Sequence, residues 1–342
     1  MKRFYAGVAV LCCVLLAVGS ALAGNPVEGK NSKVTLDGVS FLKYTYNVAN
    51  HDAAKKSLNG FEVERIYVTG KYYASDDADH QVMFRVTTDV RRYAQGSEQP
   101  LLIVLKYGYV EVKGHIPVTV ILGQQGAPIV GFLEKQWGFR SVYKVMADKD
   151  FGISSTYLGV GVKGTAADKK VDYAVTLANG CKWRKHETDK YKALLGRVTV
   201  KPTPEVAVSG LLKVNADASP SSDYMDTWFG GTVAYKAKKF AVGGDLLLKT
   251  DKKGPGTDDV KGQGISVYGR VEVKPKLNVF GRLDIVDKNT DVDDDEYNRI
   301  IAGCAHNLTK KVKAIVDVNA VTYALSDKDT DLTAEIRMEV GL

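Results

Sequence analysis

The chain has 342 residues, of which 25% are charged and 45% hydrophobic, with 47 basic and 40 acidic side chains. A bundle of membrane helices would need several stretches of about 20 apolar residues, and the sequence does not provide them. A disordered chain is excluded as well, because the hydrophobic fraction is large enough to build a core. A transmembrane β-barrel stays open, since only alternate residues of its strands meet lipid.

The N-terminal residues 1–23 are predicted to be a secretory signal peptide. Lys2 and Arg3 supply a positive end, the stretch from Phe4 to Val18 is apolar and uncharged, and Ala21-Leu22-Ala23 is a small-x-small cleavage site. The alternative is a transmembrane anchor, which the short apolar run disfavours. We therefore expect an exported protein.

Cleavage would leave residues 24–342, with 45 basic and 40 acidic side chains. Two cysteines would remain, Cys181 in an expected loop and Cys304 within an expected strand, so no disulfide framework is predicted. No pair of histidines or cysteines has the spacing of a zinc site. The sequence predicts neither a metal nor another cofactor.

Apolar and polar residues alternate almost throughout the mature chain, which is typical of strands with two different faces. At the C-terminus, Leu332, Ala334, Ile336, Met338 and Val340 share one face, and charged residues occupy the other. We place sixteen strands near residues 34–48, 61–73, 81–92, 101–113, 117–123, 156–165, 170–179, 191–200, 206–215, 227–235, 240–249, 264–273, 277–287, 299–307, 312–323 and 332–342. The alternation is irregular in 61–73 and 101–113, where a β-bulge would explain it.

The connections between these strands alternate in length. Even-numbered connections are short, whereas most odd-numbered ones are longer, and the longest covers residues 124–155. Outer-membrane barrels have short periplasmic turns and long extracellular loops. The predicted fold is therefore all-β, a 16-stranded antiparallel transmembrane β-barrel, with residues 24–342 as one barrel domain.

Alternation alone does not separate this barrel from an exported soluble β protein, in which the apolar faces would pack against each other. Three features favour the barrel. The predicted signal peptide exports the chain, the strand count is even, and whole strands carry charges on their polar face. Sixteen strands enclose a barrel wide enough for a water-filled channel.

Several segments resemble bacterial outer-membrane porins of the phosphate-selective O/P type. They are Leu105–Val112, Leu122–Pro128, Trp137–Arg140, Leu158–Gly164 and Val279–Asp284, in this order along the chain. The resemblance implies a sixteen-stranded barrel, usually a homotrimer, through which small solutes diffuse passively. One departure is the final residue, Leu342, where such barrels usually end in an aromatic residue.

The connection 124–155 is the candidate constriction loop, because in sixteen-stranded porins the corresponding loop folds into the barrel. It carries four charged candidates, Glu134, Lys135, Arg140 and Lys144. Mixed charge at a constriction would set up a field that favours polar solutes. The alternative is an outward loop whose charges are only solvated.

The charged residues on the polar face of the strands are candidates for lining the pore. They are Arg65, Arg85, Asp89, Arg91, Lys213, Asp245, Arg270, Glu272, Arg282, Asp284, Lys313, Asp317 and Arg337. Basic residues outnumber acidic ones on this face, and basic linings favour anions. We expect a mild anion preference, with a weakly selective pore as the alternative.

The predicted function is an outer-membrane porin for passive diffusion of small hydrophilic solutes, including anions. Its expected partners are outer-membrane lipid and lipopolysaccharide and two further copies of itself in a homotrimer, and no nucleic acid. The alternatives are a barrel enzyme of the phospholipase or protease type, and a closed structural or adhesion barrel. No Ser/His or Asp/His catalytic arrangement is recognisable along the chain, although neighbours across strands are not readable from a sequence.

Overall fold

The structure is a computed structural model that describes residues 33–74, 81–94, 98–114, 116–181, 183–216, 225–252, 258–325 and 328–341. The predicted signal peptide, residues 1–23, lies outside these ranges. Among the residues described, no helix has the length and apolar character needed to cross a membrane.

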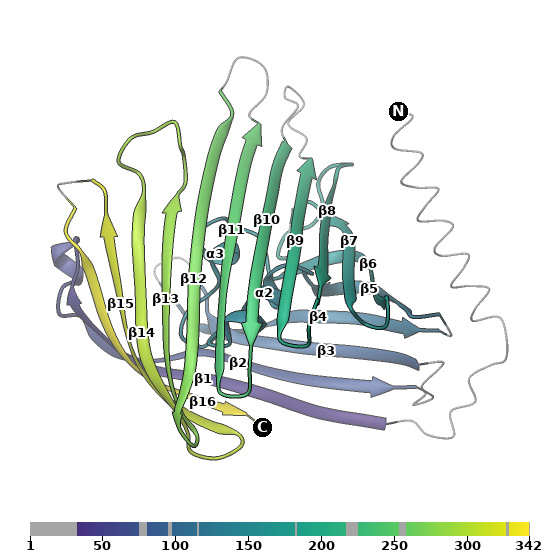
Figure 1. Ribbon diagram of the computed structural model, residues 1–342, viewed down its shortest axis with the longest axis horizontal. Helices are drawn as coiled ribbons and strands as arrows, with labels where there is room; N and C mark the ends of the chain where they lie inside the picture. Colours follow the sequence, from purple (N-terminus) through teal and green to yellow (C-terminus); the bar gives the residue numbers. More distant parts are fainter. Residues whose placement is uncertain are drawn as a thin grey trace.

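Sixteen strands of the described ranges form one closed antiparallel barrel (Figure 1). They are β1 (Lys33–Ala49), β2 (Asn59–Tyr73), β3 (Gln81–Arg92), β4 (Leu101–Lys113), β5 (Val118–Gly126), β6 (Thr156–Ala166), β7 (Val171–Asn179), β8 (Lys192–Val200), β9 (Val206–Ala216), β10 (Met225–Lys236), β11 (Phe240–Lys252), β12 (Val260–Lys274), β13 (Leu277–Asp287), β14 (Tyr297–Asn307), β15 (Val312–Tyr323) and β16 (Asp331–Gly341). Each strand pairs with its neighbours in sequence, and β16 closes the barrel against β1. The sixteen predicted strands are confirmed, with every end within four residues.

Most aliphatic side chains of the strands point out of the barrel, and the polar ones point in. On β11, the outward Leu246 and Leu248 are 46% and 45% exposed. The inward Asp245 of the same strand is only 5% exposed. The same arrangement places Ile265 and Val267 of β12 on the outside. A soluble sandwich buries its apolar rows against each other, so this barrel has the opposite polarity.

Two β-bulges lie in the strands whose alternation is irregular. Opposite β1, the pairing passes from Arg65 to Val63 of β2 and skips Glu64. Opposite β3, it passes from Tyr107 to Leu105 of β4 and skips Lys106. Each extra residue reverses the inside–outside pattern along its strand, which explains why the sequence pattern breaks there.

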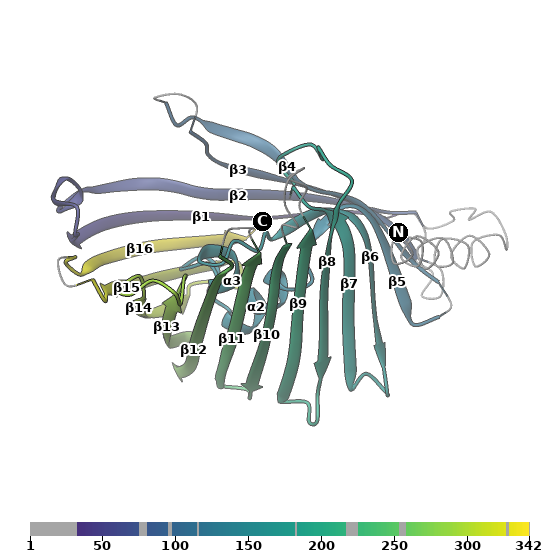
Figure 2. The same ribbon diagram turned by 90° about the horizontal axis from the view of Figure 1, so that it is seen from above.

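The long connection between β5 and β6 lies inside the ring of strands (Figure 2). It contains α2 (Val130–Trp137) and α3 (Met146–Lys149), whereas the β1–β2 connection holds only the short helix η1 (Ala53–Lys55). Helix α2 ends at Gly138, which has a positive φ of 79° and whose N–H donates to the Glu134 carbonyl. A glycine fits this left-handed position at the end of a helix without strain.

Candidate functional site

The loop between β5 and β6, residues 127–155, is held to the inner wall by polar contacts on several strands. Arg337 of β16 donates to the Ser141 carbonyl (Nη1–O 2.7 Å), and Arg282 of β13 donates to the Lys144 carbonyl (Nη1–O 2.9 Å). Arg299 of β14 forms an ion pair with Asp150 (3.4 Å). These contacts fix the loop across the barrel interior.

Apolar side chains add a second attachment. Trp137 is 2% exposed and packs edge-on against Tyr268 of β12 and Phe280 of β13, with ring centroids 5.9 Å apart in both cases. Phe139 stacks on Phe280 at 4.0 Å. Buried wall residues of the same cluster include Leu195, Leu211, Leu247, Ile301 and Ile315. The inner wall of the barrel therefore has an apolar side, against which the loop packs, and an ionic side of charged residues.

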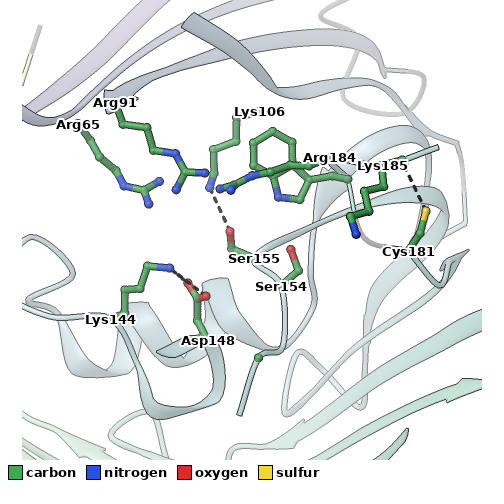
Figure 3. A pocket seen from close by; sticks show the side chains of 12 residues that line it. Arg65, Arg91, Lys106, Lys144, Asp148, Ser154, Ser155, Cys181, Arg184 and Lys185 are labelled. Carbon is green, nitrogen blue, oxygen red and sulfur yellow. Dashed lines mark hydrogen bonds and ion pairs between the residues drawn. The ribbon is translucent and has the colours of Figure 1, made fainter. Parts of the chain in front are cut away.

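The ionic side borders a cavity of about 400 Å³ between the loop and strands β2 to β4, which we call the basic chamber (Figure 3). Six cationic side chains and one carboxylate border it. They are Arg65, Arg91, Lys106, Lys144, Arg184, Lys185 and Asp148. Residues far apart in the sequence, from β2, β3, β4, the inserted loop and the β7–β8 connection, thus meet around one space.

Some of these cations have protein partners. Arg65 binds the fully buried Asp89 (Nη1–Oδ2 2.9 Å) and the Tyr67 hydroxyl (2.7 Å). Lys106 donates to the Ser155 hydroxyl (3.0 Å), and Lys144 to Asp148 (3.0 Å). Positive charge still dominates the chamber, because Asp148 is the one carboxylate among the described residues that line it, beside six cations.

Two ionisable groups of the loop are perturbed by their surroundings. Burial lowers the pKa of Lys144 from its ordinary value, although the neighbouring Asp148 opposes this shift. Burial raises the pKa of Glu134, against the opposing effect of the Arg140 guanidinium, which lies 2.5 Å from it. Lys135, on the same helix, is exposed.

A second cavity, of about 390 Å³, lies between the loop and strands β15, β16, β1 and β2. Its charged lining is mixed and consists of Lys43, Lys144, Lys149, Arg337, Glu64 and Glu335. We call it the mixed chamber. Lys144 borders both chambers, so this loop residue stands between the two open parts of the interior.

Five of the predicted pore-lining residues are engaged in ion pairs around the loop. Arg282 binds Asp284 (2.7 Å), Arg337 binds Asp317 (2.8 Å), and Lys313 binds Glu339 (3.0 Å). Arg282 and Asp284 are almost completely buried, at 4% and 0% exposed. Their contacts are with the wall and the loop, which indicates that they position the loop.

The other predicted wall residues are on the inner face as well. Asp245 accepts from the Tyr268 hydroxyl (3.1 Å), and Arg85 donates to the Thr87 hydroxyl (3.0 Å). Lys213 pairs with Asp226. Arg270 lies close to Gly138 at the end of α2: a Cβ added to this glycine would be 3.1 Å from Nη1 of Arg270. Glu272 accepts from the backbone N–H of Lys276 beside a turn (3.2 Å).

Three cationic residues of the basic chamber, Lys106, Arg184 and Lys185, are not among the candidates predicted from the sequence. Lys106 lies in the bulge of β4 and is 6% exposed, so simple alternation does not assign it to the interior. Arg184 and Lys185 belong to the β7–β8 connection, whose path is not readable from a strand pattern. The irregular alternation of residues 101–113 was the one available signal.

His51 has a partner that the sequence did not reveal. Its Nδ1 lies 2.8 Å from Oδ1 of Asp331, and the other oxygen of this carboxylate accepts from the Tyr323 hydroxyl (2.6 Å). These three side chains connect the β1–β2 connection to the start of β16 and the end of β15. Its described partners are a carboxylate and a phenol, neither of which is the serine of a Ser–His hydrolase.

Solved structures with the same architecture cover almost the whole barrel. An anion-selective porin from Comamonas acidovorans matches 91% of this chain and 100% of its own length, with a TM-score of 0.73 at 15% identity. The chain has the fold of this porin. OmpF of Salmonella typhi, solved with daunomycin, matches 91% of this chain and 98% of its own, with a TM-score of 0.69 at 12% identity.

The trimer form of OmpT from Vibrio cholerae shares the porin fold too. It covers 92% of this chain and 100% of its own length, with a TM-score of 0.65 at 10% identity. No protein-family model matches the chain, and a search of curated proteins found no match. At these identities the likeness establishes the fold, a closed antiparallel barrel of sixteen strands.

Proposed function

We propose that this chain forms a water-filled channel in an outer membrane, through which small hydrophilic solutes diffuse passively with a preference for anions. The observation that carries the proposal is the inverted polarity of the barrel. Exposed aliphatic side chains cover the outside, where lipid would meet them, and a chamber with six cations lies inside.

The preference for anions rests on the basic chamber. Rings and clusters of Arg and Lys attract anions, and the attraction is strongest where low-dielectric walls confine the field. Arg65, Arg91 and Lys106 face Lys144 across this space (Figure 3). The mixed chamber, lined by four basic and two acidic groups, has a smaller excess of positive charge and adds less to the selectivity.

The test is conductance in a planar lipid bilayer with the purified protein. A salt gradient gives a reversal potential whose sign reports anion preference. Lys106→Gln and Lys144→Gln should each lower the chloride-to-potassium permeability ratio, by about twofold if each contributes a fraction of a kcal/mol. Absence of conductance, or a preference for cations in the wild type, would contradict the proposal.

The resemblance to phosphate-selective porins extends the proposal to phosphate as one of the permeant anions. Arginine binds phosphate through its planar fork and lysine binds it as a point charge, and the basic chamber offers both. Phosphate added to a chloride solution should reduce the chloride current at concentrations where sulfate has a weaker effect. Equal inhibition by both would indicate a general anion pore.

We also propose a homotrimer, in line with the trimer form in which Vibrio cholerae OmpT was solved. Porin trimers are stable assemblies of closed cyclic symmetry, which homo-oligomers generally adopt. Native mass spectrometry of the protein extracted in mild detergent measures the assembly directly. A mass of a single chain under these conditions would contradict the trimer.

A further inference from the structure

Aromatic rings separate the cations on one side of the basic chamber. The Arg184 guanidinium lies 4.8 Å from the Trp183 ring centroid and 5.2 Å from that of Tyr93. Arg91 lies 4.5 Å from the same Tyr93 centroid. The β7–β8 connection and the end of β3 thus bring cations and aromatic rings within the distance of cation–π contacts.

Lys106 of β4 also lies close to aromatic rings. Its Nζ lies 5.9 Å from the Trp183 centroid, 5.4 Å from that of Tyr67 and 5.5 Å from that of Tyr107. An ammonium surrounded by three rings has few oxygen partners; the one hydrogen bond described for Lys106 is to Ser155. Its charge remains available to a ligand that enters the chamber.

Donors without acceptors point to a ligand as well. Nε and Nη2 of Arg91 are buried and have no acceptor within hydrogen-bond distance among the described residues, although Nε forms a longer ion pair with Oδ2 of Asp89 (3.8 Å). A buried guanidinium nitrogen without a hydrogen bond is costly, and an anion that approaches Arg91 would supply acceptors that the distant Asp89 does not. Arg91, Lys106 and Arg184 direct their cationic ends toward the same space (Figure 3).

The chamber combines two recognition chemistries, charge and ring faces. An inorganic anion uses only the charge. An anion that carries a planar aromatic ring uses both, because its carboxylate accepts from Arg91 and Lys106 while its ring packs against Trp183, the aromatic side chain that lines the chamber. The volume of about 400 Å³ is sufficient for a one-ring acid and its water.

We propose that the basic chamber is a binding site for small aromatic monocarboxylates, which the channel then passes in preference to aliphatic anions of equal charge. This inference rests on the proposed channel function and names its preferred class of solute. Packing of the ligand ring against the chamber aromatics should add about fivefold in affinity.

The experiment compares benzoate with cyclohexanecarboxylate, which has the same charge and nearly the same size but no π face. Chloride current through the full-length protein in a planar bilayer is recorded while either acid is added. We expect benzoate to inhibit the current at about fivefold lower concentration. Equal potency of the two acids would overturn the inference.

Variants of one loop locate the site. Trp183→Leu should abolish the advantage of benzoate over cyclohexanecarboxylate, and Trp183→Phe should retain most of it. Tyr191→Leu is the matched control, because this exposed ring lies in the same connection and has its own cation, Lys190, at 5.4 Å, outside the chamber. If Tyr191→Leu removes the advantage as Trp183→Leu does, the effect belongs to the loop as a whole and the assignment fails.

The two proposals fail in different ways. A protein that conducts chloride but does not discriminate between the acids contradicts the aromatic site and leaves the channel intact. A protein that does not conduct contradicts the channel. In that case, equilibrium dialysis of the detergent-solubilised protein against the same two acids still measures the chamber, and equal binding or no binding would overturn the site.

Discussion

At the scale of single residues, Lys144 is a loop cation whose charge depends on its surroundings. It borders both chambers, and burial lowers its pKa although Asp148 opposes the shift. A lysine is charged below its pKa and neutral above it, so this residue loses its charge at lower pH than an ordinary lysine, whose pKa is about 10.4. Anion attraction should decrease accordingly in alkaline solution.

We therefore expect the chloride preference to decrease as the pH rises from about 7 toward about 10. Lys144→Arg should reduce this decrease, because a guanidinium keeps its charge throughout the range. Reversal potentials across a fixed salt gradient at each pH measure the effect. If the wild type and the arginine variant show the same decrease, Lys144 is not the group responsible.

Gln124 stabilises the β-bulge in β4. Its side-chain amide donates to the carbonyls of Leu105 (2.7 Å) and Lys106 (2.9 Å), on the strand beside it. A bulge leaves backbone groups unpaired, and an unsatisfied carbonyl at a lipid-facing position is costly. Gln124 thereby helps to keep Lys106 in the chamber.

Replacement of this amide tests its role. Gln124→Leu should destabilise the barrel by about 1–3 kcal/mol, the usual cost of leaving buried polar groups without partners. The midpoint of urea unfolding in detergent gives the change, and Leu122→Ala, an exposed outward position on the same strand, is the control. A Gln124→Leu barrel as stable as the wild type would show that the bulge carbonyls need no partner.

At the scale of elements, the strands are the part of the fold that the sequence predicts best. The polarity of each strand alternates because one face meets the exterior and the other the interior, and this constraint acts on every residue. The ends of β13 and β15 were therefore predicted to the residue. Even the two irregular segments were informative, because each contains a bulge.

The wall residues against which the loop packs were not predictable from the alternation of polar and apolar residues. Alternation indicates which face a residue occupies, but not whether that inner position meets water or protein. Phe280, Ile301 and Leu211 lie on the inner face and are buried among loop residues. Their apolar character follows from contacts between segments more than 70 residues apart, such as Phe139 with Phe280, and these contacts have no periodic signature.

The attachment of the loop gives the prediction at this scale. Trp137→Ala removes a side chain that packs on Phe139, Tyr268 and Phe280, and such truncations cost about 3–5 kcal/mol. Since the loop occupies the interior, its partial release should change the single-channel conductance and increase current noise. Proteolysis within residues 127–155 should become faster.

Phe229→Ala is the control for this variant. Phe229 lies on the outward face of β10 and is 58% exposed, so its side chain points away from the interior that the loop occupies. Its removal should leave conductance and proteolysis as in the wild type. Were the two variants to behave alike, the change would reflect a general loosening of the barrel.

At the scale of the whole molecule, the edge of the barrel formed by the short turns is strongly basic. Ten lysines lie at or beside the turns of five consecutive hairpins, from β6–β7 to β14–β15, and all are exposed. They are Lys169, Lys170, Lys201, Lys236, Lys238, Lys239, Lys274, Lys276, Lys310 and Lys311. Acidic residues are fewer there: Asp168 and Glu205 lie in the same turns, and Glu272 accepts from the backbone N–H of Lys276.

This arc acts on ions at a distance, which distinguishes it from the basic chamber. Interactions between exposed charges are screened within about 3 Å at 1 M salt but extend to about 30 Å at 0.01 M. The chamber cations lie next to a passing ion and act at either ionic strength. The lysine arc should therefore contribute to anion preference only in dilute salt.

Replacement of Lys238, Lys239, Lys310 and Lys311 by glutamine should lower the chloride-to-potassium permeability ratio about twofold at low salt and leave it unchanged at 1 M. The matched control replaces four exposed lysines near the opposite edge, Lys55, Lys56, Lys261 and Lys288, where acidic neighbours such as Asp52 already offset the charge. Reversal potentials at both ionic strengths measure the effect. An equal loss at high and low salt would mean that these lysines act at short range, and an equal loss in the control would mean that only the net charge of the protein matters.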